Sequence, residues 1–213
     1  GNQIGDDGIT AISDAIKLNN TLEKLFLGWN QIGDRGMIAL TRAIKVNRGL
    51  QKLYLGWNQI GNEGMKALAE AMVINQTIQV IYLDGNITIG DEGLVAVAEA
   101  LKVNNSLRNL GLGRNQIGNE GVIALANTMK TNNSIKELQL EYNNIGDEGL
   151  IALSDAFKVN NSLEIIILEK NSIRDVGIIA LAEALKINAS LNIIDLGYNL
   201  ISDKHLNSLS EAF

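Results

Sequence analysis

The residues best suited to chemistry are large aromatic side chains at fixed spacing. The chain holds two Trp, four Tyr and three Phe, and most of these rings stand at positions that recur every 28 residues, with one step of 29. Exposed rings of this size anchor protein–protein contacts by burying flat apolar area. The sequence therefore predicts recognition rather than catalysis. The seven recurring rings are Phe26, Trp29, Tyr54, Trp57, Tyr82, Tyr142 and Tyr198.

Catalytic chemistry finds little support in the sequence. Cysteine is absent and His205 is the single histidine, so disulfides, thiolate metal sites, multi-histidine sites and a serine triad are not expected. Acidic pairs such as Asp147-Glu148 recur at the same place in another unit, as Asp91-Glu92, and so belong to the repeat pattern. The sequence predicts a protein that is not an enzyme and holds no metal or cofactor.

Composition and charge narrow the class of partner. Of 213 residues, 46% are hydrophobic, which suits a continuous core, yet no stretch approaches the ~20 apolar residues that a membrane span needs. The net charge of −6 lacks the positive field that nucleic-acid binding relies on. No basic-then-apolar leader opens the chain. We expect another protein as partner, no nucleic acid, no membrane, and an intracellular, cytoplasmic location.

An internal repeat must position these side chains. Before each recurring asparagine, a Leu-x-x-Leu-x-Leu segment alternates with a period of two, which predicts a short strand with one buried face. After it the apolar spacing becomes three and four, which predicts an amphipathic helix of about three turns. The 29-residue step falls at Asn86-Ile87-Thr88-Ile89, where other units read Asn-x-Ile. The asparagines, expected to form a hydrogen-bonded ladder, are Asn2, Asn30, Asn58, Asn86, Asn115, Asn143, Asn171 and Asn199.

Polar residues mark the ends of each predicted helix. An Asp or Asn, such as Asp34 or Asn62, stands where its side chain is expected to accept the first free N–H groups of its own helix. A glycine such as Gly36 is expected to let the helix approach the strand closely. The turn Asn104-Asn105-Ser106 contains a glycan-acceptor motif, but the same motif in the same turn of other units favours backbone hydrogen bonding instead.

This pattern resembles the ribonuclease-inhibitor-like class of leucine-rich repeats over nearly the whole chain. The resemblance implies an α/β solenoid shaped as a horseshoe, with parallel strands on the concave face, helices on the convex face and about 28 residues per repeat. It implies a single domain over residues 1–213 with about seven to eight repeats, and we expect a longer parent chain because both ends fall inside a unit. Ribonuclease inhibitor itself is cysteine-rich with two alternating repeat types, and neither feature occurs here, which disfavours nuclease inhibition.

The resemblance also implies protein recognition on the concave face. Leucines of each strand point inward, so the side chains between them face outward. Phe26, Tyr54 and Tyr82 then form one row of rings, and Trp29 and Trp57 form a second row, with a strand spacing of roughly 5 Å. The predicted contact residues are Phe26, Trp29, Tyr54, Trp57, Tyr82, Arg114, Tyr142, Lys170 and Tyr198.

Several alternatives stay open at this stage. The rings either bind a partner or only stabilise adjacent strands, and the row from Arg114 to Tyr198 suits a structural cation–π stack. Gly111 and Gly113 either floor a pocket or carry no function, and the carboxylates of the later units either attract a basic partner or form an ordinary solvated face. By fold analogy the chain could be a GTPase-activating protein like the Ran-directed one, and the tryptophan pair could bind carbohydrate.

Overall fold

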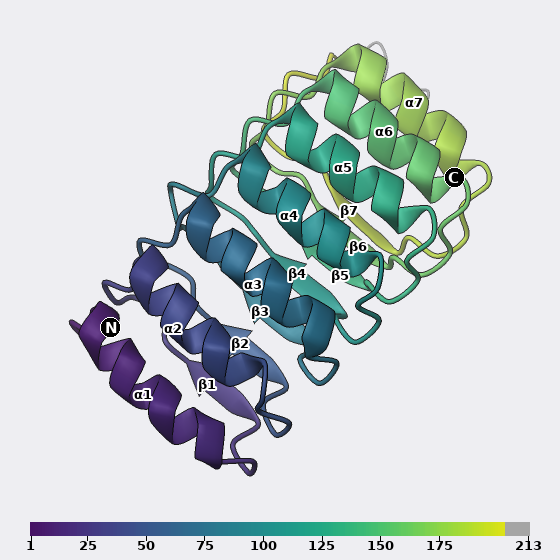
Figure 1. Ribbon diagram of the computed structural model, residues 1–213. Helices are drawn as coiled ribbons and strands as arrows, with labels where there is room; N and C mark the ends of the chain where they lie inside the picture. Colours follow the sequence, from purple (N-terminus) through teal and green to yellow (C-terminus); the bar gives the residue numbers. More distant parts are fainter. Residues whose placement is uncertain (203–213) are drawn as a thin grey trace.

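The computed structural model describes residues 1–202, which form one stack of strand–helix units (Figure 1). Within this part of the chain, seven strands make one parallel sheet in the order β1 to β7. Successive strands pair in register, for example Tyr54 opposite Tyr82, and Tyr82 opposite Gly111 across the 29-residue step. The predicted α/β solenoid is confirmed, while His205 lies outside the described residues.

The elements alternate regularly along the chain. The helices are α1 (Asp6–Leu18), α2 (Asp34–Ile44), α3 (Asn62–Ile74), α4 (Asp91–Leu101), α5 (Asn119–Met129), α6 (Asp147–Phe157) and α7 (Asp175–Leu185). The strands are β1 (Lys24–Phe26), β2 (Lys52–Tyr54), β3 (Val80–Tyr82), β4 (Asn109–Gly111), β5 (Glu137–Gln139), β6 (Ile165–Ile167) and β7 (Ile193–Asp195).

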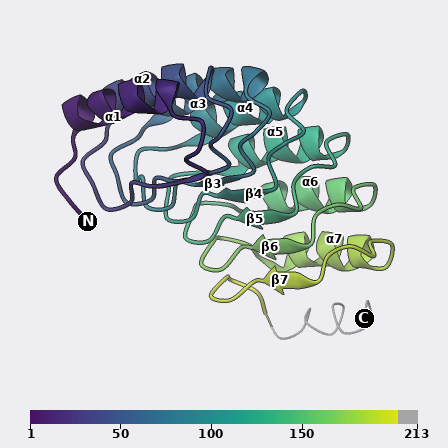
Figure 2. The same cartoon turned by 90° about the horizontal axis from the view of Figure 1, so that it is seen from below.

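The stack bends with strands inside the curve and helices outside (Figure 2). Parallel strands lie about 4.8 Å apart while packed helices lie about 8–10 Å apart, so the helix layer is wider and the stack must curve. The middle residue of each internal strand points into the core, and Leu53, Ile81 and Leu138 are fully buried. Each such side chain contributes roughly 1.5–3 kcal/mol through burial.

The predicted asparagine ladder runs from Asn30 to Asn199 and links neighbouring units, whereas Asn2 is exposed and its side chain makes no ladder bond. The Asn58 side chain accepts the N–H of Ile32 at 3.0 Å and donates to the carbonyls of Leu27 and Leu55, each at 2.9 Å. One buried amide thus satisfies three backbone groups that water cannot reach.

A second asparagine ladder runs through the turns between helix and strand. Asn104 is 2% exposed, donates to the carbonyls of Met72 and Asn75, and accepts the N–H of Leu107 at 3.0 Å. The glycan-acceptor motif at this turn therefore serves the backbone, because its amide nitrogen is buried and already hydrogen-bonded.

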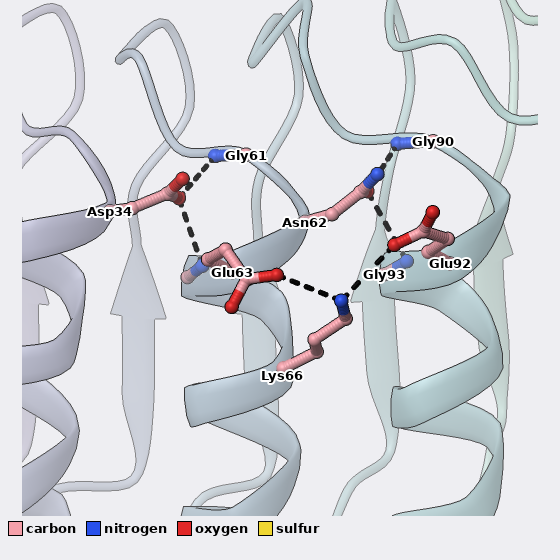
Figure 3. A network of polar contacts seen from close by, with 9 residues as sticks. Asp34, Gly61, Asn62, Glu63, Lys66, Gly90, Glu92 and Gly93 are labelled. Atoms are coloured by element: carbon pink, nitrogen blue, oxygen red, sulfur yellow. Dashed lines mark hydrogen bonds and ion pairs between the residues drawn. The ribbon is translucent and has the colours of Figure 1, made fainter.

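The expectation that each Asp or Asn caps its own helix is wrong. The residue before the helix is a glycine in six of the seven described helices and an arginine in α7, and none of these makes a side-chain cap bond. Asp34, the first residue of α2, instead accepts the N–H groups of Gly61 and Gly64 at the start of α3, at 2.6 and 2.9 Å (Figure 3). Asn62 does the same for α4 (Figure 3). Each unit caps the next one because the packed helices bring their first turns side by side.

The glycine in the first turn of a helix, such as Gly64, serves the capping contact between helices rather than the predicted close approach of the helix to its strand. A Cβ added at Gly64 would lie 2.7 Å from Oδ1 of Asp34 and 2.8 Å from Cγ2 of Ile60. The missing side chain therefore makes room for the neighbouring carboxylate. Lys66 adds an exposed bridge between Glu63 and Glu92, at 2.8 and 3.1 Å (Figure 3), of the kind that contributes little to stability.

The one-residue insertion leaves a defect in the first ladder. In other units the Oδ1 of the ladder asparagine accepts an isoleucine N–H from the preceding unit, as Asn143 does from Ile117 at 3.0 Å. The longer loop turns the N–H of Ile89 to the carbonyl of Asn86 at 2.9 Å. Oδ1 of Asn115 is therefore buried with no hydrogen-bond partner.

This difference yields a stability test with an internal control. Asn143→Ala removes bonds to Ile117, Leu112 and Leu140, so we expect a loss of about 2–4 kcal/mol in the free energy of unfolding. Asn115→Ala should cost about 1 kcal/mol less, because its Oδ1 accepts no N–H. Urea unfolding followed by circular dichroism measures both, and equal losses would contradict the assigned roles.

Candidate protein-binding surface

Three rows of side chains cross the strand side of the stack. We name them by position: the strand row, the middle row and the turn row. The strand row comprises Phe26, Tyr54, Tyr82, Gly111, Gln139, Ile167 and Asp195. The middle row comprises Gly28, Gly56, Asp84, Gly113, Glu141, Glu169 and Gly197, and the turn row comprises Trp29, Trp57, Gly85, Arg114, Tyr142, Lys170 and Tyr198.

The strand row begins with a stack of three rings. The ring centroids of Phe26 and Tyr54 are 4.3 Å apart with planes 9° from parallel, and those of Tyr54 and Tyr82 are 5.5 Å apart. Phe26 remains 68% exposed. The register places one ring directly beside the next, because paired strands superpose equivalent positions.

The turn row has an unusual backbone. All six of its non-glycine residues have φ between 52° and 59°, and Gly85 has φ 72°. This left-handed conformation costs an L-residue roughly 1–2 kcal/mol, which glycine avoids. It turns the chain after each strand so that the next asparagine can reach back to the carbonyl three residues earlier, as Asn58 does to Leu55.

Side chains of the turn row stack almost continuously. The rings of Trp29 and Trp57 lie 4.4 Å apart and 6° from parallel. The Arg114 guanidinium lies 3.6 Å from the Tyr142 ring centre and 5.9 Å from that of Trp57. Lys170 lies between the rings of Tyr142 and Tyr198, at 4.5 and 4.8 Å. The stack that was expected from Arg114 onward is present, and the proximity of Lys170 and Arg114 lowers the pKa of the Tyr142 hydroxyl.

Gly111 and Gly113 do not floor an open pocket. A Cβ at Gly111 would collide with the ring of Tyr82, and one at Gly113 would collide with the carboxyl of Glu141. Tyr82 donates its hydroxyl to Glu137 at 3.2 Å. Burial, and after it the Glu137 carboxylate, raises the pKa of Tyr82 to about 12. The two glycines therefore leave room for the side chains of Tyr82 and Glu141 to lie across the strand side of the sheet.

Carboxylates occupy the middle row beyond the rings. Asp84 accepts the N–H of Gly113 at 3.0 Å, and burial raises the pKa of its carboxyl. Burial also raises the pKa of Glu141; Asp84 adds to that rise and Arg114 offsets part of it. Sequence reasoning missed Asp84, although its 29- and 28-residue steps to Gly113 and Glu141 place all three in one row.

A groove lies at the end of the turn row where the two tryptophans meet the inserted loop. It has a volume of about 640 Å³ and is lined by Trp29, Trp57, Gly85, Ile87 and Thr88 among others. Trp57 leans over Gly85, where a Cβ would lie 2.8 Å from Cδ2 of the indole. Ile87, part of the inserted loop, is 66% exposed. Sequence reasoning noted the insertion but did not connect it with the tryptophans.

The predicted contact residues all lie in the strand and turn rows. Trp29 and Tyr54 stay outside the core, Trp29 at 60% exposure and Tyr54 half-buried, as the strand alternation predicts. No helix within residues 1–202 is both long and apolar enough to cross a bilayer. Partner contact by these residues stays a prediction.

The family model of the leucine-rich repeat matches most of the chain, at residues 1–13, 18–40, 46–69, 75–98, 103–126, 131–154 and 159–182. The chain belongs to the leucine-rich-repeat family. No curated protein matches its sequence.

Two solved structures resemble it in fold. One, described as leiomodin-1 actin-binding site 2, has a TM-score of 0.59 and 21% identity, over 70% of this chain and 86% of that one. The other is the tropomodulin C-terminal domain of Caenorhabditis elegans, with a TM-score of 0.52 and 15% identity, over 96% and 90% of the two chains. At these identities the likeness concerns the fold alone.

The left-handed backbone of the turn row can be tested at Lys170. Its φ is 52°, so Lys170→Gly should be more stable than Lys170→Ala by about 1 kcal/mol, although both lose the contact with Tyr142. Lys102, with φ −62°, is the control: there glycine should be the less stable replacement, by about 0.5–1 kcal/mol. Urea unfolding measures the four variants. If the same replacement, glycine or alanine, were the more stable one at both sites, the strain argument would be refuted.

The raised pKa of Glu141 predicts a pH-dependent effect on stability. Folding favours the protonated carboxyl, so the ionised group destabilises the protein near neutral pH, and this cost disappears as pH falls through its folded and then its unfolded pKa. Glu141→Gln should therefore be more stable by a few tenths of a kcal/mol near neutral pH, with the difference shrinking in acid. Urea unfolding across this pH range measures it, and Glu120→Gln on the exposed face of α5 is the control. A difference that grows in acid would contradict the prediction.

Proposed function

We propose that this protein is a non-catalytic scaffold that binds another protein on its strand side. The principal contact surface is the aromatic patch, defined as Phe26, Trp29, Tyr54, Trp57 and Tyr82. The observation that carries the proposal is the exposure of stacked large rings there, with Phe26 at 68%, Trp29 at 60% and Trp57 at 39%. Contiguous apolar surface of this kind typically marks an interaction site.

The patch is also rigid before any partner arrives. Each ring lies against at least one other ring, and the rings are attached to β1, β2 and β3 or the turns after them; β2 and β3 pair with a strand on both sides and β1 pairs with β2. A partner therefore loses little affinity to ordering these side chains, since their rotamers are already restricted. Arg114, Tyr142, Lys170 and Tyr198 would extend the contact surface along the turn row.

Fold relatives are compatible with such a role. The leiomodin-1 structure is described by its actin-binding site, which makes actin a reasonable member of a panel of test proteins for this chain. We also propose an intracellular location, in line with the absence of cysteine.

The test compares three immobilised proteins in an extract of the source cells: the wild type, Trp29→Ala/Trp57→Ala, and Val73→Ala/Val103→Ala. Val73 lies in α3 and Val103 two residues after the end of α4, and they are 50% and 53% exposed, so their truncation removes apolar surface away from the patch. We expect the control to retain the wild-type partners and the tryptophan variant to retain at least about tenfold less. Quantitative mass spectrometry provides the measurement. Equal retention by a tryptophan variant with an unchanged circular dichroism spectrum would rule out this patch.

A further inference from the structure

The middle row brings two carboxylates together just beyond the aromatic patch. Asp84 follows β3 and Glu141 follows β5, and both cover the glycine between them, Gly113. Their electrostatic coupling is direct enough for Asp84 to raise the pKa of Glu141. The pair therefore concentrates negative charge at one place on the strand side.

Two cations of the adjacent turn row, Arg114 and Lys170, lie on aromatic rings and form no ion pair with these carboxylates. Arg114 lies on the ring of Tyr142, and Lys170 lies between two rings of the turn row. Among the ion pairs of residues 1–202, none includes Asp84 or Glu141. Oε2 of Glu141 is buried without a hydrogen-bond partner. Both carboxylates have lost solvent without forming an ion pair, and the charge of Arg114 offsets only part of the pKa rise of Glu141, so a cation from a partner would stabilise the pair.

The missing charge is better supplied by a side chain than by a metal ion. The described residues contain no group of three His, Cys, Asp or Glu side chains placed to hold a metal. Ca²⁺ takes 6–8 oxygen ligands and Mg²⁺ six, which two carboxylates supply poorly. A guanidinium or ammonium needs only hydrogen-bond acceptors, and these carboxylates provide them.

An apolar site lies close enough to the two carboxylates for one short peptide to contact both. The groove beside Trp57, Gly85 and Ile87 opens toward a flat indole and an exposed aliphatic side chain. Trp57 and Gly113 belong to units two strands apart, which is about 10 Å, or about three residues of extended chain. One short peptide segment can therefore occupy both places.

We propose, on the basis of the protein-binding function above, that the partner presents a basic–apolar segment to this face. A Lys or Arg of that segment lies against the outer side of the Asp84 and Glu141 carboxylates, which themselves cover Gly113. A large apolar side chain about three residues away fills the groove at Trp57 and Ile87. Charge complementarity selects the partner, while the rings supply most of the buried area.

The test begins with a displayed library of random peptides selected on the wild-type protein. We expect enrichment of peptides with a Lys or Arg about three residues from an aromatic or large aliphatic residue. Fluorescence anisotropy then measures synthetic copies of these peptides against three variants. Asp84→Asn/Glu141→Gln should weaken binding about tenfold, and Trp29→Ala/Trp57→Ala should weaken it at least as much. Glu120→Gln/Glu148→Gln, with the same charge change on exposed helix positions, should leave it unchanged.

The outcomes separate the two proposals. Peptides without basic residues, or binding that is unchanged in Asp84→Asn/Glu141→Gln, would overturn the basic–apolar partner, and the proposed function would survive if the tryptophan variant still lost binding. A library without any binder, or binders insensitive to both double substitutions, would overturn both proposals. Displacement of the peptide by Mg²⁺ or Ca²⁺ at low concentration, to the same extent in wild type and in Glu120→Gln/Glu148→Gln, would point to a metal site instead. That result would overturn the inference.

Discussion

The buried asparagine side chain is the interaction on which the rest of this molecule depends. Each strand holds only three residues, so the chain must turn away from the sheet while its backbone is still inside the core. Asn58 resolves this by accepting the N–H of Ile32 and donating to the carbonyls of Leu27 and Leu55. Because those groups belong to two successive units, the same bonds that close one turn also attach it to its neighbour.

Capping between helices follows the same principle on the convex side. The carboxylate of Asp34 serves the first turn of α3, and the absent side chain of Gly64 gives it room. The first turn of each such helix therefore depends on the preceding helix for polar partners that it cannot supply itself. One inserted residue disturbs the asparagine ladder at a single place. There the N–H of Ile89 bonds to a carbonyl of its own loop, and Oδ1 of Asn115 remains without a partner.

The candidate binding surface follows from the left-handed backbone of the turn row. The left-handed residue that precedes each ladder asparagine projects its side chain into one row, and the sequence fills this row with rings and cations. Stacking of Trp29 on Trp57 and of Arg114 on Tyr142 offsets part of the conformational cost. The cations lie on rings, so Arg114 offsets only part of the pKa rise of Glu141, and Asp84 and Glu141 form no ion pair among the described residues.

The sequence by itself determined the repeat, which strand residues point into the core, and the side on which Trp29 and Tyr54 lie. A period of two places alternate side chains on opposite faces, and a regular repeat superposes equivalent positions of successive units. Even the cation–π row from Arg114 to Tyr198 could be read from spacing. Only the tertiary structure decided which helix Asp34 caps, how Tyr82 and Glu141 fill the space over two glycines, and where the groove opens. These contacts join different units, and they depend on the lateral offset and curvature of the stack, which no pattern within one unit specifies.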